Sequence, residues 1–166
     1  MKGLRFCLAM VLAVVLLISA SDRFAAADLL VTSDQLVNLQ GSTTNGTIPS
    51  FQQVLPDATT PVFTIPAGKV FVVTRVQGGG SAPGNVLGLK IVLEKQATVK
   101  AYFKQGMDSI WYDAGTNTTG GAIKGENYYP GFPISNPFRA RLLGPADTLL
   151  VGKLNMRIFG YLADIP

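Results

Sequence analysis

The chain has 166 residues, with 14 basic and 10 acidic side chains, a single cysteine and no histidine. Without histidine, Ser-His and Cys-His catalysis are excluded, and so are zinc and copper sites of the ordinary type. The basic residues form no cluster that predicts a nucleic-acid or membrane-surface footprint.

Residues 1–27 have the pattern of a secretory signal peptide. Two basic residues precede an unbroken apolar run over residues 8–20, and three alanines follow at 25–27. This run is shorter than the roughly 20 residues that a membrane-spanning helix needs. We therefore expect cleavage after residue 27 and a secreted, periplasmic or cell-surface protein without a membrane span, an uncleaved anchor helix being the alternative.

Residues 28–166 are expected to fold as one domain. The only cysteine, Cys7, lies in the leader, so the exported domain has no disulfide and no thiolate ligand. Its stability must come from burial of apolar surface, which a domain of this size can supply.

The first half of this domain alternates strand-like segments with segments rich in turn residues. The turn Pro66–Gly68 suits chain reversal because Pro fixes φ and Gly permits unusual φ. We predict strands at Leu29–Leu39, Pro61–Ile65 and Lys69–Val76, an extended loop over 40–60 and a flexible loop over 78–85.

A hairpin is predicted from Val86–Glu94 and Thr98–Lys104, joined by a three-residue linker. Alternation puts one set of apolar side chains in the core and leaves Lys90 and Glu94 on the opposite face. The predicted core set is Leu87, Leu89, Ile91, Leu93, Val99, Ala101 and Phe103.

The second half contains the longest irregular segment, residues 113–137, which is rich in Gly, Asn, Thr, Tyr and Pro. Strands are predicted to follow at Phe138–Leu143, Thr148–Val151 and Leu154–Leu162. In the last strand, Leu154, Met156, Ile158 and Leu162 share one face, and Asn155, Arg157, Phe159 and Tyr161 share the other.

About eight short strands without a helix predict an all-β fold, an antiparallel β-sandwich. A jelly-roll-like topology is preferred and an immunoglobulin-like sandwich is second. One apolar face per strand fits sheets with one face on a core and one face in water.

The segment Phe63–Val73, with its Pro-Ala-Gly turn, resembles one that recurs in small exported bacterial β-sandwich proteins. The segment Arg157–Leu162 is similar to their last strand. This resemblance covers a small part of the chain and implies the fold. Because such proteins mostly lack an assigned function, it implies no functional residue.

A first candidate site consists of Trp111, Tyr112, Tyr128 and Tyr129, in or beside the long irregular segment. Exposed aromatic faces can stack on sugar rings while a phenol or indole keeps one polar contact. The alternative is that these rings, with Phe132, fold inward and anchor the loop.

The acidic residues near this segment suggest two weaker possibilities. Oxygens of Asp108, Asp113, Asn117 and Glu126 could hold calcium, although their spacing matches no defined loop. The three carboxylates could also include a pair for glycoside hydrolysis. Since such residues are common in turns and on surfaces, we expect no metal, no cofactor and no catalysis.

A second candidate surface is the outer face of the last strand, formed by Arg157, Phe159 and Tyr161. Arginine and aromatic residues are enriched in protein interfaces, and Arg139 and Arg141 could lie beside this face. It suggests contact with another protein or with a second copy of the chain.

These patterns favour an exported, non-enzymatic β-sandwich that acts by binding or assembly. One alternative is a carbohydrate-binding module that uses the loop aromatics. Another is a structural surface subunit that self-assembles. The expected partners are a glycan or a protein, with no nucleic acid.

Overall fold

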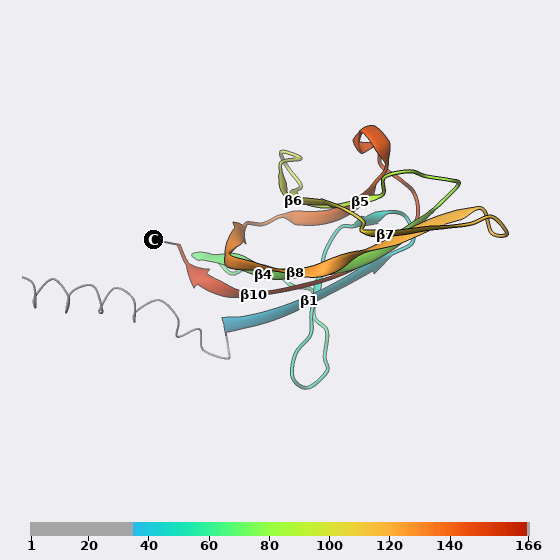
Figure 1. Cartoon of the computed structure of the whole chain (residues 1–166). Coiled ribbons are helices and arrows are strands. Elements are labelled where there is room, and N and C mark those ends of the chain that lie inside the picture. The colour runs from blue at the N-terminus through green and yellow to red at the C-terminus, as the bar shows by residue number, and fades with distance from the viewer. Residues whose placement is uncertain (1–34, 166) are drawn as a thin grey trace, which may run out of the picture. The chain divides into compact units, whose positions relative to one another are not determined.

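The computed structural model describes residues 35–165, so the predicted leader and the first residues of the predicted domain lie outside the described residues. The described residues belong to one compact unit. They form two antiparallel sheets stacked as the two layers seen in Figure 1. The all-β sandwich predicted from sequence is confirmed. Among residues 35–165, no helix is long and apolar enough to cross a membrane.

The larger sheet, sheet A, has six strands in the order β3-β1-β10-β4-β8-β7, and the smaller, sheet B, has four in the order β2-β9-β5-β6. The strands of sheet A are β1 (Leu36–Thr43), β3 (Gln52–Gln53), β4 (Lys69–Pro83), β7 (Ser109–Asp113), β8 (Thr118–Ile134) and β10 (Lys153–Asp164). Those of sheet B are β2 (Thr47–Ile48), β5 (Lys90–Lys95), β6 (Ala101–Gly106) and β9 (Phe138–Leu143).

The strand pairing is that of a jelly roll. β1 pairs with β10, β2 with β9, β4 with β8, and β5 with β6. The chain is thus arranged as one long hairpin, wrapped so that alternate pairs fall in opposite sheets, as two interlocked Greek keys require. The preferred topology is therefore confirmed over the immunoglobulin-like alternative.

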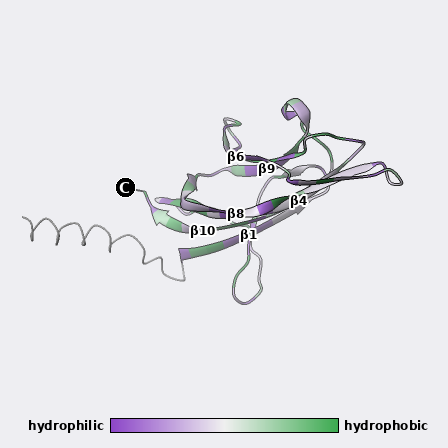
Figure 2. Ribbon diagram, viewed as in Figure 1, coloured by the Kyte–Doolittle hydropathy of each residue, from purple (hydrophilic) through white to green (hydrophobic). Residues whose placement is uncertain are grey.

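The core lies between the two sheets. Along β10, Leu154, Met156 and Ile158 are buried and Asn155 and Arg157 are exposed, as the period-two pattern predicts. Figure 2 shows this alternation of hydrophobic and hydrophilic residues along the strands. β9 coincides with the predicted strand, with its apolar positions buried.

Two predicted loops are strands instead. Residues 78–85 mostly continue β4, and most of residues 113–137 form β8. A Cβ on Gly80 would lie 2.7 Å from the Lys153 carbonyl oxygen and 3.1 Å from Leu142 Cδ1 in the facing sheet. Glycine is present in β4 because strand and sheet approach closely here, and the sequence pattern of a flexible loop was misleading.

The predicted loop 40–60 is also partly strand, since β1 extends to Thr43 and β2 and β3 follow. Conversely, Pro61–Ile65 makes only an isolated bridge through Val62, and Thr148–Val151 only one through Leu149. Both predicted strands are wrong as such, although Phe63 and Ile65 do enter the core.

The β5–β6 hairpin is present, with part of its predicted core wrong. Leu89, Ile91, Leu93 and Phe103 are buried, but Ala101 is exposed and Val99 and Leu87 are 54% and 75% exposed. Val99 has a φ of 52° in the turn, so the strand alternation does not reach it. Leu87 precedes β5, which begins at Lys90.

Glu94, predicted on the wet face, is 1% exposed on the outer side of sheet B. Its carboxylate accepts hydrogen bonds from Arg139 Nε at 2.8 Å and from Arg141 Nη2 at 2.9 Å. These arginines come from β9, which lies beside β5, so the two cations shield the carboxylate from water and neutralise it. The prediction that Arg139 and Arg141 flank the outer face of β10 is wrong, because β10 belongs to the other sheet.

Candidate functional site: an uncovered edge strand and the outer face of sheet A

Strand β7 forms one edge of sheet A, where its outer side faces no other described strand. All five of its residues are exposed. The three in the middle are Ile110, Trp111 and Tyr112, with exposed fractions of 45%, 54% and 44%. Ile, Trp and Tyr favour extended chain, which explains why this short segment adds to β8 as a strand.

The side chains of β7 alternate between the two faces of the sheet. Trp111 pairs with Gly120 of β8, and a Cβ on that glycine would overlap the indole ring. The ring therefore lies flat across β8 on the outer face of sheet A. Tyr112 points to the opposite face, where its hydroxyl donates to Asn117 Oδ1 at 2.9 Å.

The other two predicted aromatic residues lie elsewhere on β8. Tyr128 is eight positions beyond Gly120, which corresponds to about 25 Å along a strand. Its ring packs edge-on against Phe103 and Phe132, with centroids 5.9 and 5.3 Å away. Tyr129 is 88% exposed, beside the cis peptide bond to Pro130. The four aromatics therefore do not form one binding platform, and Tyr128 serves as an anchor.

Burial raises the pKa of the Tyr128 phenol to about 12, and the nearby carboxylate of Glu126 adds to the effect. The phenol donates weakly to that carboxylate, at 3.4 Å. The group is therefore protonated and uncharged at neutral pH, as suits a packed anchor.

The remaining sheet edges in the described part of the chain are protected. β8 extends beyond β7, and its residues 123–134 have no described strand on their outer side. This part of β8 carries Lys124, Glu126, Pro130 and Pro133, and charge and proline both oppose the addition of a strand. The edge at β3 is covered by the segment 61–63, through hydrogen bonds from Gln53 N to Pro61 O and from Phe63 N to Phe51 O, both 2.8 Å. β2 has only two residues. β6 carries the exposed Lys104 and is tied to β8 by the Gln105–Glu126 hydrogen bond of 3.1 Å. Short length, charge and covering segments are the usual protections of an edge. β7 has no covering segment among the described residues, and its three central residues are apolar and exposed.

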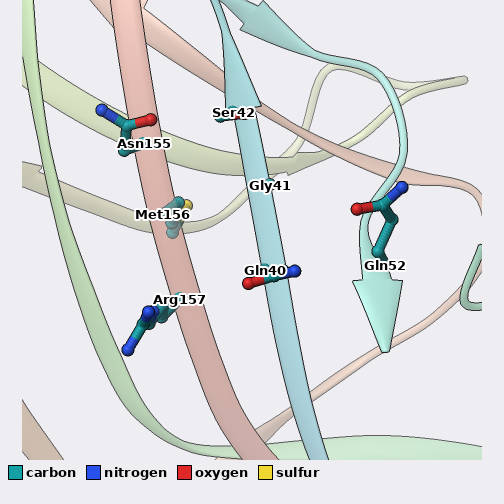
Figure 3. Close-up of a pocket in the computed structure, with 7 residues that line it drawn as sticks. All are labelled: Gln40, Gly41, Ser42, Gln52, Asn155, Met156 and Arg157. Carbon is teal, nitrogen blue, oxygen red and sulfur yellow. The ribbon is translucent and has the colours of Figure 1, made fainter. Parts of the chain in front are cut away.

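The outer face of sheet A also holds a shallow polar groove of about 360 Å³ (Figure 3). Gln40 and Ser42 of β1, Gln52 of β3, and Asn155 and Arg157 of β10 line it. A second hollow next to it adds Gln77 of β4. Sequence reasoning missed these amides, because Gln40 and Gln52 fall in a segment predicted as loop.

The predicted interface on β10 does lie on this outer face. Arg157 is exposed, and Phe159 and Tyr161 are half-buried. The guanidinium carbon of Arg75 lies 6.0 Å from the centre of the Phe159 ring. Phe159 also lines a groove of about 610 Å³ with Leu36 and Leu55. Whether this surface meets a partner stays a prediction.

The acidic candidates take part in separate local contacts. Asp113 accepts from Gly115 N at 2.9 Å and from Thr116 Oγ1 at 2.7 Å, and the Thr116 bond above all lowers the pKa of its carboxyl. Asp108 accepts from Lys124 N at 3.3 Å, and Glu126 from Gln105. Within residues 35–165, no three His, Cys, Asp or Glu residues are grouped so that they could hold a metal ion.

No protein-family model matches the chain. No curated protein matches it either. Among solved structures, the chain is similar to one titled "Acidic stable capsid structure of Helicobacter pylori bacteriophage KHP30", with 14% identity, a TM-score of 0.33, and coverage of 80% of this chain and 94% of that chain. At this TM-score the similarity carries no argument about the role of the chain.

Proposed function

We propose that this domain is a non-enzymatic interaction module that acts by pairing its edge strand β7 with another extended chain. The uncovered, apolar β7 edge is the observation that carries the proposal. Free backbone N–H and C=O groups on such an edge act as a template for an added strand, while the alternating side chains supply selectivity.

In this proposal the protein is exported and binds a partner without catalysing a reaction. The carboxylates of Asp113, Asp108 and Glu126, the candidate residues for catalysis, make separate local contacts. An uncovered strand edge can also pair with other chains and cause aggregation. A specific partner would explain why the protein keeps such an edge. Export through the predicted leader remains part of the proposal.

A displayed library of linear peptides, selected on the immobilised protein, tests this function. We expect selected peptides to have strand-forming sequences and to lose binding to the Ile110→Lys variant, whose charge lies on the edge. The matched control is Leu87→Lys, which places the same charge at a site that is 75% exposed outside the sheets. Selected peptides that bind both variants equally would overturn the proposal.

A second candidate function, binding of a neutral polysaccharide, rests on the outer face of sheet A. Trp111 offers a flat ring there, and the amides of Gln40, Gln52 and Asn155 offer paired donors and acceptors for sugar hydroxyls. A glycan array is the test. Binding that is lost in both Trp111→Ala and Asn155→Ala would favour this function over strand pairing, and the absence of any bound glycan would remove it.

A further inference from the structure

Building on the proposed strand pairing, we propose that the partner of β7 is β7 of a second copy, joined antiparallel about a two-fold axis at Trp111. The starting point is which edges are open. Since the other edges of the described residues are short, covered or interrupted by charge and proline, the edge best suited to accept β7 is β7 of a second copy. Such a contact is isologous and closes as a dimer, whereas pairing with a different edge would continue into a fibre.

The residues of β7 complement themselves in this register. Pairing all five residues places Trp111 opposite its own copy and Ile110 opposite Tyr112 of the partner subunit. Each of the three exposed apolar residues thereby meets an apolar one, and aromatic and β-branched pairs are favourable cross-strand neighbours.

The charges of the strand fit the same register. Asp113 is the only charged residue of β7, and an aspartate is ionised at neutral pH. The two-fold axis places it opposite the partner subunit's Ser109, a hydroxyl donor, so that no like charges oppose each other. A parallel arrangement in register would place the two aspartates side by side, which is unfavourable.

The area available sets the strength of the contact. Aromatic side chains carry roughly 150–250 Å² each, so the half-exposed residues of two strands bury on the order of 500 Å² of side-chain surface. Stable complexes bury more than about 1,200 Å². We therefore expect a reversible dimer with a dissociation constant above about 1 µM, whose sheets A join into one continuous sheet.

Sedimentation analysis of the full chain from about 1 µM to about 1 mM tests the dimer. We expect a monomer–dimer equilibrium that Ile110→Lys weakens by about tenfold or more, because the new charge faces an apolar partner. Leu87→Lys should leave the equilibrium unchanged. A monomer at every concentration, or a dimer equally affected by both variants, would overturn the inference.

Cross-linking tests the register independently of the energetics. In a chain with Cys7→Ser, which removes the only native thiol, Trp111→Cys places two thiols across the two-fold axis. Directly opposed strand residues have Cα atoms about 4.5–5.5 Å apart, within the range of a disulfide. Mild oxidation should give a covalent dimer with Trp111→Cys and none with Leu87→Cys; equal yields would contradict the proposed axis.

The two proposals can fail separately. If the chain stays monomeric but binds peptides in a β7-dependent manner, β7 is a binding edge and a second copy is not its partner. A monomer without any β7-dependent peptide would remove both.

Discussion

Tyr128 shows how one residue can combine packing with a titratable group. Its ring contacts Phe132 on the same strand and Phe103 on β6. The contact with Phe103 joins β8 of sheet A to β6 of sheet B. Phe103 is 8% exposed. The side chains that pack between the two sheets here are therefore aromatic. Their removal should lower the free energy of unfolding and leave binding unchanged.

The raised pKa of Tyr128 predicts a loss of stability in alkali. The unfolded phenol ionises near pH 10, whereas the folded phenol keeps its proton until about pH 12. Stability should therefore be fully present below pH 10 and decline as the pH rises toward 12. Ultraviolet titration should show one phenol that ionises late and is missing in Tyr128→Phe. Its persistence in that variant, or its loss in Tyr129→Phe, would refute the assignment.

Replacement of Phe103 should test the aromatic cluster directly. Phe103→Ala removes a buried ring and is expected to lower the free energy of unfolding by about 3–5 kcal/mol in denaturant melts. Val99→Ala, at the exposed turn residue of the same hairpin, should change it by less than about 0.5 kcal/mol. Similar losses in the two variants would mean that the cluster contributes little.

At the scale of elements, β4 and β8 depend on glycine in an unusual way. Gly78 and Gly80 face sheet B, and a Cβ on Gly78 would lie 3.1 Å from Ile91 Cδ1. Their absence of side chains lets the two layers approach at this end of the molecule. Only the fold distinguishes a glycine that provides flexibility from one that permits close packing.

We therefore expect Gly80→Ala to destabilise the protein by about 1–3 kcal/mol, as overpacking does. The control is Gly106→Ala in β6, where no atom lies within 4 Å of the added Cβ. That variant should be neutral or slightly stabilising, because alanine restricts the unfolded chain. Thermal melts of the two variants, run side by side, decide the matter, and equal melting temperatures would contradict the packing argument.

At the scale of the whole molecule, stability must come from one core. The jelly roll closes its first strand against its last, since β1 pairs with β10 along eight residue pairs. The strands that bury the core come from both halves of the sequence, so that neither half should fold alone. The β7 edge remains available because the other open edges are short, charged or covered.

The predicted leader gives a test at this scale. Expressed in a bacterium, the full chain is expected to be exported and cleaved after Ala27, giving a mature protein that begins Asp28-Leu29-Leu30. Intact mass and N-terminal sequencing of the exported fraction measure this. A cytoplasmic product of unchanged mass, or a membrane-anchored one, would contradict the predicted cleavage.

The alternation of apolar and polar residues predicted β9, β10 and the β5–β6 hairpin, because a half-buried strand imposes a period of two on its own sequence. The absence of histidine restricted the chemistry without any structure. Tertiary structure alone decided that glycine-rich segments are strands, that Glu94 is buried between two arginines, and that Trp111 and Tyr128 lie apart. Those outcomes depend on which strands become neighbours, and strand neighbours in a jelly roll are far apart in sequence.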